Sequence, residues 1–126
     1  MGITLAVDHA NRFVNVRAVG PITVDDIRAH IEEERLAGGL AHRELIDARG
    51  ASPDFSSQDV RSVVAVLRRL GSDSRLGPTA VLVDSQVGYG MLRMFEALLD
   101  DVCAVKPFYE QEAAEQWLAG FSEGTT

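Results

Sequence analysis

The segment Thr79-Ala80-Val81-Leu82-Val83 is apolar along its whole length and does not alternate with polar residues. This pattern is typical of a β-strand that is covered on both faces. Strands of that kind belong to sheets in which helices connect parallel strands and pack against the sheet. The segment therefore predicts an α/β fold.

Upstream of this segment, the N-terminal residues show a different pattern. Residues 3–7 and residues 13–19 both alternate large apolar residues with small or polar ones, and Asp8 to Asn11 between them favour a turn. A period of two residues predicts two half-exposed strands that form a hairpin at one side of a sheet.

The remaining residues predict strands and helices in alternation. Helices are expected from the N-cap Thr23 to Gly38-Gly39, from Ser56 to Gly71, and over about 88–100 and 110–119, with strands over 44–48, 79–83 and 102–105. Strands separated by helices imply right-handed parallel crossovers. The order ββαβαβαβα predicts a five-stranded mixed sheet (N-terminal antiparallel hairpin, remainder parallel) with four helices, in a single domain spanning 1–126.

Composition and charge exclude several classes of protein. The chain has 126 residues, 46% of them hydrophobic and 25% charged, with a formal net charge of −7. An acidic domain repels phosphate backbones, so we expect no nucleic-acid partner. No apolar run approaches the ~18 residues that span a bilayer, so we expect no stable membrane insertion. The first residues lack the basic segment of a signal peptide, and we predict a cytoplasmic location.

The histidines and the cysteine do not indicate catalysis. His9, His30 and His42 lie in three different segments without the spacing of metal ligands, and we expect them to be solvated at the surface. Cys103 lies within an apolar run and is expected to be a buried small residue rather than a reactive thiol. No cofactor and no metal are predicted from these residues.

Two aspartates each lie near the carboxyl end of a predicted parallel strand. Ligands bind beyond the carboxyl ends of such strands, where Asp47 and Asp84 are expected. With Ser85 they could hold Mg²⁺ through oxygen ligands, or each could accept backbone N–H donors in its own loop. No phosphate-binding glycine loop or nucleophile accompanies them, and we therefore predict no catalytic residue.

The predicted third helix carries more apolar residues than one contact with a sheet requires. They are Met91, Leu92, Met94, Phe95, Leu98 and Leu99. Surplus apolar surface indicates a partner or an adaptable ligand pocket, and methionine suits both. The alternative is a helix that is buried between the sheet and a neighbouring helix.

Three stretches carry a resemblance to a known family. They are Leu45-Ile46-Asp47-Ala48-Arg49, residues 88–96 (GYGMLRMFE), and Phe108 with residues 112–118 (EAAEQWL). Together with the element order, these stretches resemble the SpoIIAA-like superfamily, whose bacterial members are often labelled STAS/SEC14-domain proteins. The resemblance implies a STAS-like α/β fold over nearly the whole chain.

The resemblance also implies candidate modification sites. The better-understood relatives are anti-sigma-factor antagonists that are switched by phosphorylation of a serine at the N-terminus of the second helix. Their Asp-Ser-Ser-Gly stretch is matched here by Asp54-Phe55-Ser56-Ser57-Gln58, in which Phe55 is inserted and Gln58 replaces the glycine. Ser56 and Ser57 are therefore possible phosphoserines. Alternatively, Ser56 is only the N-cap of the helix.

These observations predict a non-catalytic regulatory or protein-interaction module that binds a protein partner or forms a homodimer. The alternative function is a carrier or sensor of a small apolar, lipid-like ligand, since Sec14-type carriers share a related fold. Arg93 is expected to meet an anion or to form a surface ion pair. The candidate ligand or partner surface comprises Asp47, Arg49, Asp84, Tyr89, Met91, Arg93 and Met94.

Overall fold

The N-terminal hairpin forms one side of the sheet. The structure is a computed structural model and describes residues 2–121. Strands β1 (Gly2–Asp8) and β2 (Phe13–Thr23) pair in an antiparallel arrangement. On β2 the apolar residues Val14, Val16 and Ala18 are buried and the residues between them are exposed. The hairpin predicted from the period of two is therefore confirmed.

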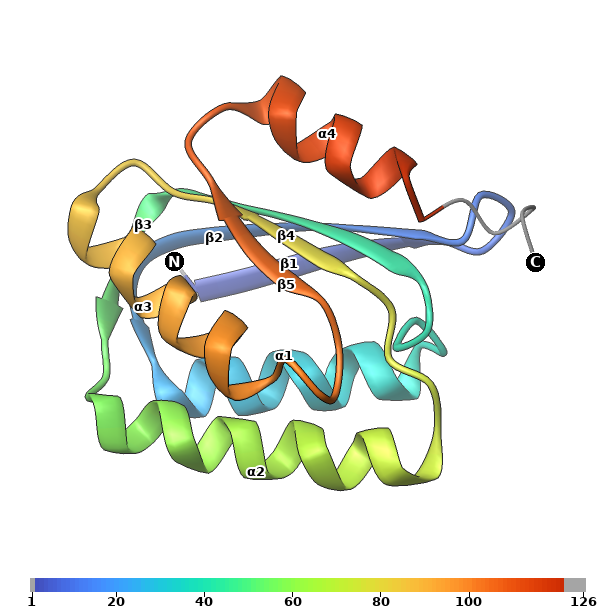
Figure 1. The fold of residues 1–126 in the computed structure, drawn as a ribbon, viewed down its shortest axis with the longest axis horizontal. Helices are drawn as coiled ribbons and strands as arrows, with labels where there is room; N and C mark the ends of the chain where they lie inside the picture. Colours follow the sequence, from blue (N-terminus) through green and yellow to red (C-terminus); the bar gives the residue numbers. More distant parts are fainter. Residues whose placement is uncertain (1, 122–126) are drawn as a thin grey trace.

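The remaining elements follow in the predicted order (Figure 1). They are α1 (Val24–Leu36), β3 (Arg43–Asp54), α2 (Ser57–Asp73), β4 (Thr79–Leu82), α3 (Gln86–Leu98), β5 (Val105–Phe108) and α4 (Gln111–Ala119). The five strands lie in the order β1-β2-β3-β4-β5, and β2 to β5 are parallel. The α/β class, the mixed sheet and the four helices are confirmed.

Helices cover both faces of the sheet. Helices α1, α2 and α3 lie on one face and α4 lies on the other (Figure 1). The first face carries the larger core cluster, which comprises Ile31, Val60, Val63, Val64, Phe95 and Leu99. Ala80 and Leu82 of β4 pack with α4 on the second face, where Ala114 and Leu118 are buried. The whole of β4 is thus covered on both sides, as its unbroken apolar sequence predicts.

The helix starts agree with the sequence. Thr23 Oγ1 accepts the backbone N–H of Asp26 at 3.2 Å, and Ser56 Oγ accepts that of Asp59 at 3.2 Å, each within a complete capping box. Each cap contributes about 1 kcal/mol to stability. At the other end of α1, Gly38 adopts a φ of 77°, which glycine tolerates without strain and which ends the helix.

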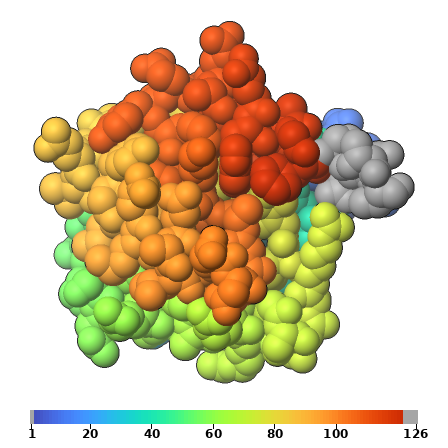
Figure 2. Space-filling model, in the orientation of Figure 1, coloured from blue at the N-terminus to red at the C-terminus, as the bar shows by residue number. Residues whose placement is uncertain are grey.

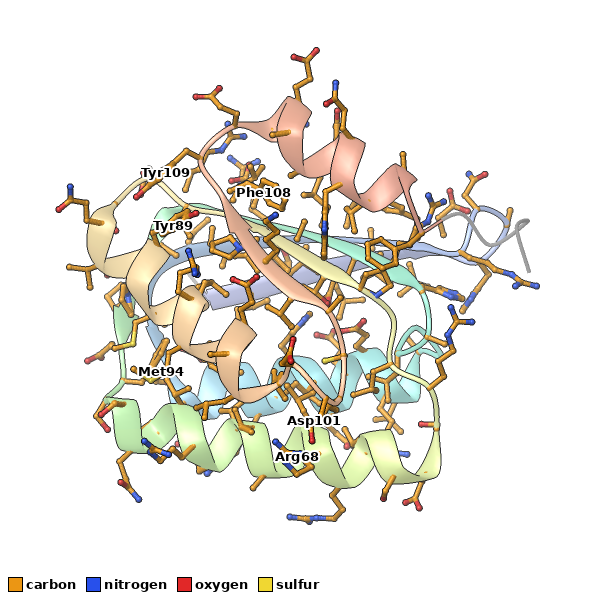
Figure 3. All side chains as sticks on the ribbon, in the orientation of Figure 1. Arg68, Tyr89, Met94, Asp101, Phe108 and Tyr109 are labelled. Atoms are coloured by element: carbon orange, nitrogen blue, oxygen red, sulfur yellow. The ribbon has the colours of Figure 1, made fainter. Side chains whose placement is uncertain are left out.

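Two boundaries were placed too early. Strand β3 continues past Ala48 to Asp54, because its second half pairs with the end of β2. Helix α2 continues past Gly71 to Asp73. On this helix, Arg68 donates to Asp101 at 2.8 Å and to the carbonyl oxygen of Leu98 at 2.8 Å, and so ties α2 to the end of α3 (Figure 3).

Two further boundaries differ from those predicted from the sequence. Helix α3 begins at Gln86 rather than Gly88, because Ser85 is its N-cap and accepts the N–H of Gly88 at 3.0 Å. Strand β5 was predicted over 102–105 but runs from Val105 to Phe108 and contains Pro107. Proline is tolerated there because β5 is the last strand of the sheet and has an unpaired side. Among residues 2–121, no helix is long and apolar enough to cross a membrane.

Candidate functional site

An apolar cavity lies between the sheet and helices α1, α2 and α3. Its volume is about 210 Å³. On the face seen in Figure 2, the side chains of α3 are in contact with those of α2, and residues of both helices belong to the larger core cluster. The apolar lining comes from the strands and all three helices and includes Ala18, Ile22, Ile31, Ile46, Val63, Val81, Met91, Leu92, Phe95 and Leu99. A cavity of this kind can hold a small apolar molecule.

The cavity explains the wide apolar arc of α3. Met91, Leu92, Phe95 and Leu99 line it. Met94, between α3 and α2 in Figure 3, packs against the larger core cluster together with Leu98. All six residues are buried or half-buried, so the arc faces inward and offers no exposed apolar stripe to a partner. The alternative of a helix buried against the sheet and its neighbour is the arrangement observed.

Three ionisable side chains lie together in the wall of this cavity. His30 and Glu34 are one helical turn apart on α1 and therefore share a face. Glu44 of β3 pairs in register with Thr79 of β4. Their side chains meet on the face of the sheet that α1, α2 and α3 cover. His30 Nε2 lies 3.0 Å from Glu44 Oε2 and 3.4 Å from Glu34 Oε1. We call these residues the buried polar cluster.

Burial controls the protonation of Glu34 in this cluster. The side chains of His30, Glu34 and Glu44 are only 7%, 7% and 8% exposed. Burial, together with the charge of Glu44 and a hydrogen bond to it, raises the pKa of Glu34 to about 10. Glu34 is therefore protonated at neutral pH. Thr79 Oγ1 donates to Glu44 Oε1 at 3.0 Å, and His30 Nδ1 is buried without a hydrogen-bond partner.

The expectation that all three histidines are solvated is wrong for His30. It is buried because the residues beside it on α1, Ile27 and Ile31, place its face against the sheet and α2. His9 is exposed and His42 is half-buried, and their ring nitrogens lie 2.9 Å apart. The cluster itself was missed. Its sequence signal is the spacing of four between His30 and Glu34 on an apolar helix face.

Cys103 lines the same cavity. Its side chain is half-buried. Burial is the main cause that raises the pKa of the thiol to about 11, and the charge of Glu44 is the second. A thiol with a raised pKa carries little thiolate at neutral pH and is a weak nucleophile. This environment supports the expectation that Cys103 is not a reactive thiol.

Of the two predicted aspartates, Asp84 follows its strand as expected, whereas Asp47 lies within β3, which continues to Asp54. Asp47 pairs with Leu82 at the end of β4, and Asp84 lies two residues beyond Leu82. The Arg49 guanidinium donates to Asp47 at 3.0 and 2.9 Å and lowers the pKa of that carboxyl group. Asp47 also accepts the backbone N–H of Arg49 at 3.1 Å. Arg49 thus engages both carboxylate oxygens of Asp47.

The other predicted surface residues have partners of their own. The rings of Tyr89 and Tyr109 are stacked with centroids 4.7 Å apart (Figure 3), and Tyr109 is 46% exposed. Arg93 forms the surface ion pair that the sequence suggested, with Glu96 at 3.1 Å. Arg49 also donates to Gln111 at the start of α4, at 3.3 Å. The carboxyl edge of the sheet is therefore a polar, partly aromatic surface that is held together by side-chain contacts.

Ser56 and Ser57 lie at the N-terminus of α2 and are both exposed. The Ser56 hydroxyl is engaged as the N-cap, as the alternative reading expected. Phe55, the inserted residue, turns inward and makes an edge contact with Phe95, with ring centroids 6.4 Å apart. The insertion therefore anchors the start of α2 to α3 and leaves both serines accessible.

Solved structures share this arrangement of strands and helices. One is an uncharacterised protein of the DUF3478 family with a SpoIIAA-like fold from Shewanella loihica PV-4, with 19% identity, coverage of 93% of each chain and a TM-score of 0.58. Another is the anti-sigma factor antagonist SpoIIAA in its unphosphorylated form, with 19% identity, coverage of 94% of this chain and 99% of that chain, and a TM-score of 0.57.

No protein-family model matches the sequence, and no curated protein matches it either. The structural likeness spans nearly the whole of each chain at low sequence identity. This chain therefore has the SpoIIAA-like fold that its motifs resembled.

Proposed function

We propose that this protein is a non-catalytic regulatory module of the STAS type, which acts in the cytoplasm by binding a protein partner or a second copy of itself. The observation that carries the proposal is the fold shared with an anti-sigma factor antagonist over 94% of this chain. Fold alone does not assign a function, so the proposal also needs a suitable surface.

The carboxyl edge of the sheet and the start of α2 supply that surface. Val87 and Tyr109 are exposed large apolar residues, and Ser57 is exposed at the N-terminus of α2. Aromatic side chains are common anchors in protein interfaces. A phosphate on Ser57 would be stabilised by the free N–H groups and the dipole at the helix N-terminus, and would change the charge of this surface.

Native mass spectrometry of the protein purified gently from its own source tests this proposal. The expected result is a dimer or a stoichiometric complex with a second protein, with any phosphate located by fragmentation to Ser56 or Ser57. Ser57→Asp should weaken the complex at least tenfold, whereas Ser72→Asp, at an exposed position of the same helix, should not. A bare monomer, without partner or phosphate, would contradict the proposal.

The cavity favours a second candidate function, a carrier or sensor of a small apolar ligand. Its volume of about 210 Å³ and its largely apolar lining suit a small apolar molecule.

Filling the cavity tests this second function. Ala18→Leu points a larger side chain into the cavity from β2, and Ala65→Leu makes the same change at an exposed position of α2. The wild-type protein and Ala65→Leu should bind a small apolar probe such as benzene, measured as a rise in melting temperature. Ala18→Leu should not respond. An equal response of all three proteins would contradict binding in this cavity.

A further inference from the structure

The buried polar cluster has the geometry of a metal-binding site. His30, Glu34 and Glu44 each offer one ligand atom, and these atoms all lie within 4.8 Å of one another. His30 Nε2 is 3.4 Å from Glu34 Oε1 and 3.0 Å from Glu44 Oε2. Ligand atoms that surround Zn²⁺ at its usual bond lengths lie roughly 3.3 Å apart in a tetrahedron. The two separations from His30 Nε2 bracket that value, and the third is below 4.8 Å.

The scaffold around the three ligands is rigid. His30 and Glu34 are fixed one turn apart on α1, and Glu44 lies on the adjacent strand β3. Thr79 Oγ1 donates to Oε1 of Glu44 at 3.0 Å, which orients the carboxylate. Outer hydrogen bonds of this kind hold the ligands of metal sites in place.

The cluster is shielded from solvent. All three side chains are more than nine-tenths buried, and the two carboxyl groups share the Nε2 side of one imidazole. His30 Nδ1, on the other side of the ring, is also buried and has no hydrogen-bond partner among the described residues. Buried polar atoms without a partner are rare and indicate an additional bound group or solvent molecule.

We propose that His30, Glu34 and Glu44 bind a divalent transition-metal ion of the Zn²⁺, Fe²⁺ or Mn²⁺ type at the wall of the apolar cavity. One imidazole and two carboxylates suit these ions, whereas Ca²⁺ takes six to eight oxygen ligands. The carboxyl group of Glu34, protonated in the metal-free protein, releases its proton to solvent when the ion binds. Three protein ligands leave at least one coordination position for water or for a molecule in the cavity. The metal-free alternative is a cluster bridged by protons only.

Other possible ligands must be removed before the site is tested. His9 and His42 lie 2.9 Å apart near the surface and could bind metal adventitiously. Cys103 lines the same cavity and carries a sulfur atom. We therefore choose as background the full chain with His9→Gln, His42→Gln and Cys103→Ser, stripped with EDTA. Circular dichroism checks the fold of each variant.

Titration with ZnCl₂ by calorimetry and with CoCl₂ by visible absorption gives the readout. The background protein should bind one ion per chain with a Kd of about 1 µM or tighter. Co²⁺ should show the absorption of a site with four or five ligands. His30→Gln and Glu34→Gln should each weaken binding by about 100-fold. Glu33→Gln, an exposed position on the same helix, should leave it unchanged.

Two results would overturn the proposal. One is a folded background protein that binds neither ion at concentrations of about 1 mM. The other is a Glu34→Gln variant that binds as tightly as the background, which would place the bound ion outside the cluster. Because glutamine has nearly the shape of a protonated glutamate, Glu34→Gln decides the question even if His30→Gln does not fold.

Discussion

Replacement of Glu34 by glutamine should change how the stability of this protein depends on pH. Glu34 is buried beside Glu44, and these surroundings raise its pKa to about 10. Glutamine is neutral at every pH and has nearly the same shape. Its amide can donate to Glu44 where the protonated carboxyl group does so now. We therefore expect Glu34→Gln to keep the contacts of the cluster. The variant has no ionisable group at position 34 and should lose the pH dependence that this group causes.

The sign of the effect follows from the two pKa values of Glu34. Its pKa is near 4.5 in the unfolded chain and about 10 in the folded protein, so the folded state binds the proton more tightly. The contribution of Glu34 to the free energy of unfolding is complete below the unfolded-state pKa. It is lost as the pH rises toward the folded-state pKa. The slope is up to about 1.4 kcal/mol per pH unit. Between pH 6 and pH 8 the wild type should lose roughly 3 kcal/mol more than Glu34→Gln.

Urea unfolding at pH 6 and pH 8 measures this difference, in buffer with EDTA so that no metal contributes. The fluorescence of Trp117, which contacts Phe108 next to the sheet, reports unfolding. Glu33→Gln on the exposed side of α1 is the control and should follow the wild type. The difference between Glu34→Gln and the wild type isolates the contribution of Glu34. Equal pH dependence in the wild type and Glu34→Gln would refute the reasoning.

Three further predictions concern the caps, the core and the edge of the sheet. Ser56→Ala should lower the free energy of unfolding by about 1 kcal/mol in a denaturant titration, while Ser57→Ala should change it little; equal effects would contradict the cap assignment. Leu82→Ala, at a position that is 1% exposed, should cost about 2–5 kcal/mol in the same assay, and a smaller loss would mean that the core relaxes around it. Arg49→Met should raise the pKa of Asp47 toward its ordinary value, measured by NMR titration, and an unchanged pKa would show that the guanidinium is not the cause.

The order of the elements and the direction of the strands were predictable because they depend on local patterns. The period of two over 13–19, the capping residues Thr23 and Ser56, and the unbroken apolar run of β4 each describe neighbours in the chain. Boundaries were less predictable where pairing with a distant strand decides them. The second half of β3 is a strand because it pairs with the end of β2, which no local pattern in residues 49–54 indicates.

The candidate surface was predictable only in part. Asp84 follows β4 as expected, but Asp47 does not end its strand, because β3 continues to Asp54 beside the end of β2. The ion pair that joins Asp47 to Arg49 was not predicted, since it depends on side-chain directions rather than on strand order. Met91 and Met94 were assigned to a possible ligand or partner surface; Met91 lines the cavity and Met94 packs against the larger core cluster, because α2 covers that part of α3.

The sequence by itself determined the α/β class, the order of strands and helices and the apolar face of each helix, because these follow from residues that are close in the chain. Only the tertiary structure decided that His30, Glu34 and Glu44 meet in the wall of a cavity. His30 and Glu44 belong to different elements, and their contact requires α1 to pack on β3. The same packing removes water from the cluster, and this desolvation, which no sequence pattern records, makes the cluster chemically distinct from surface histidines and glutamates.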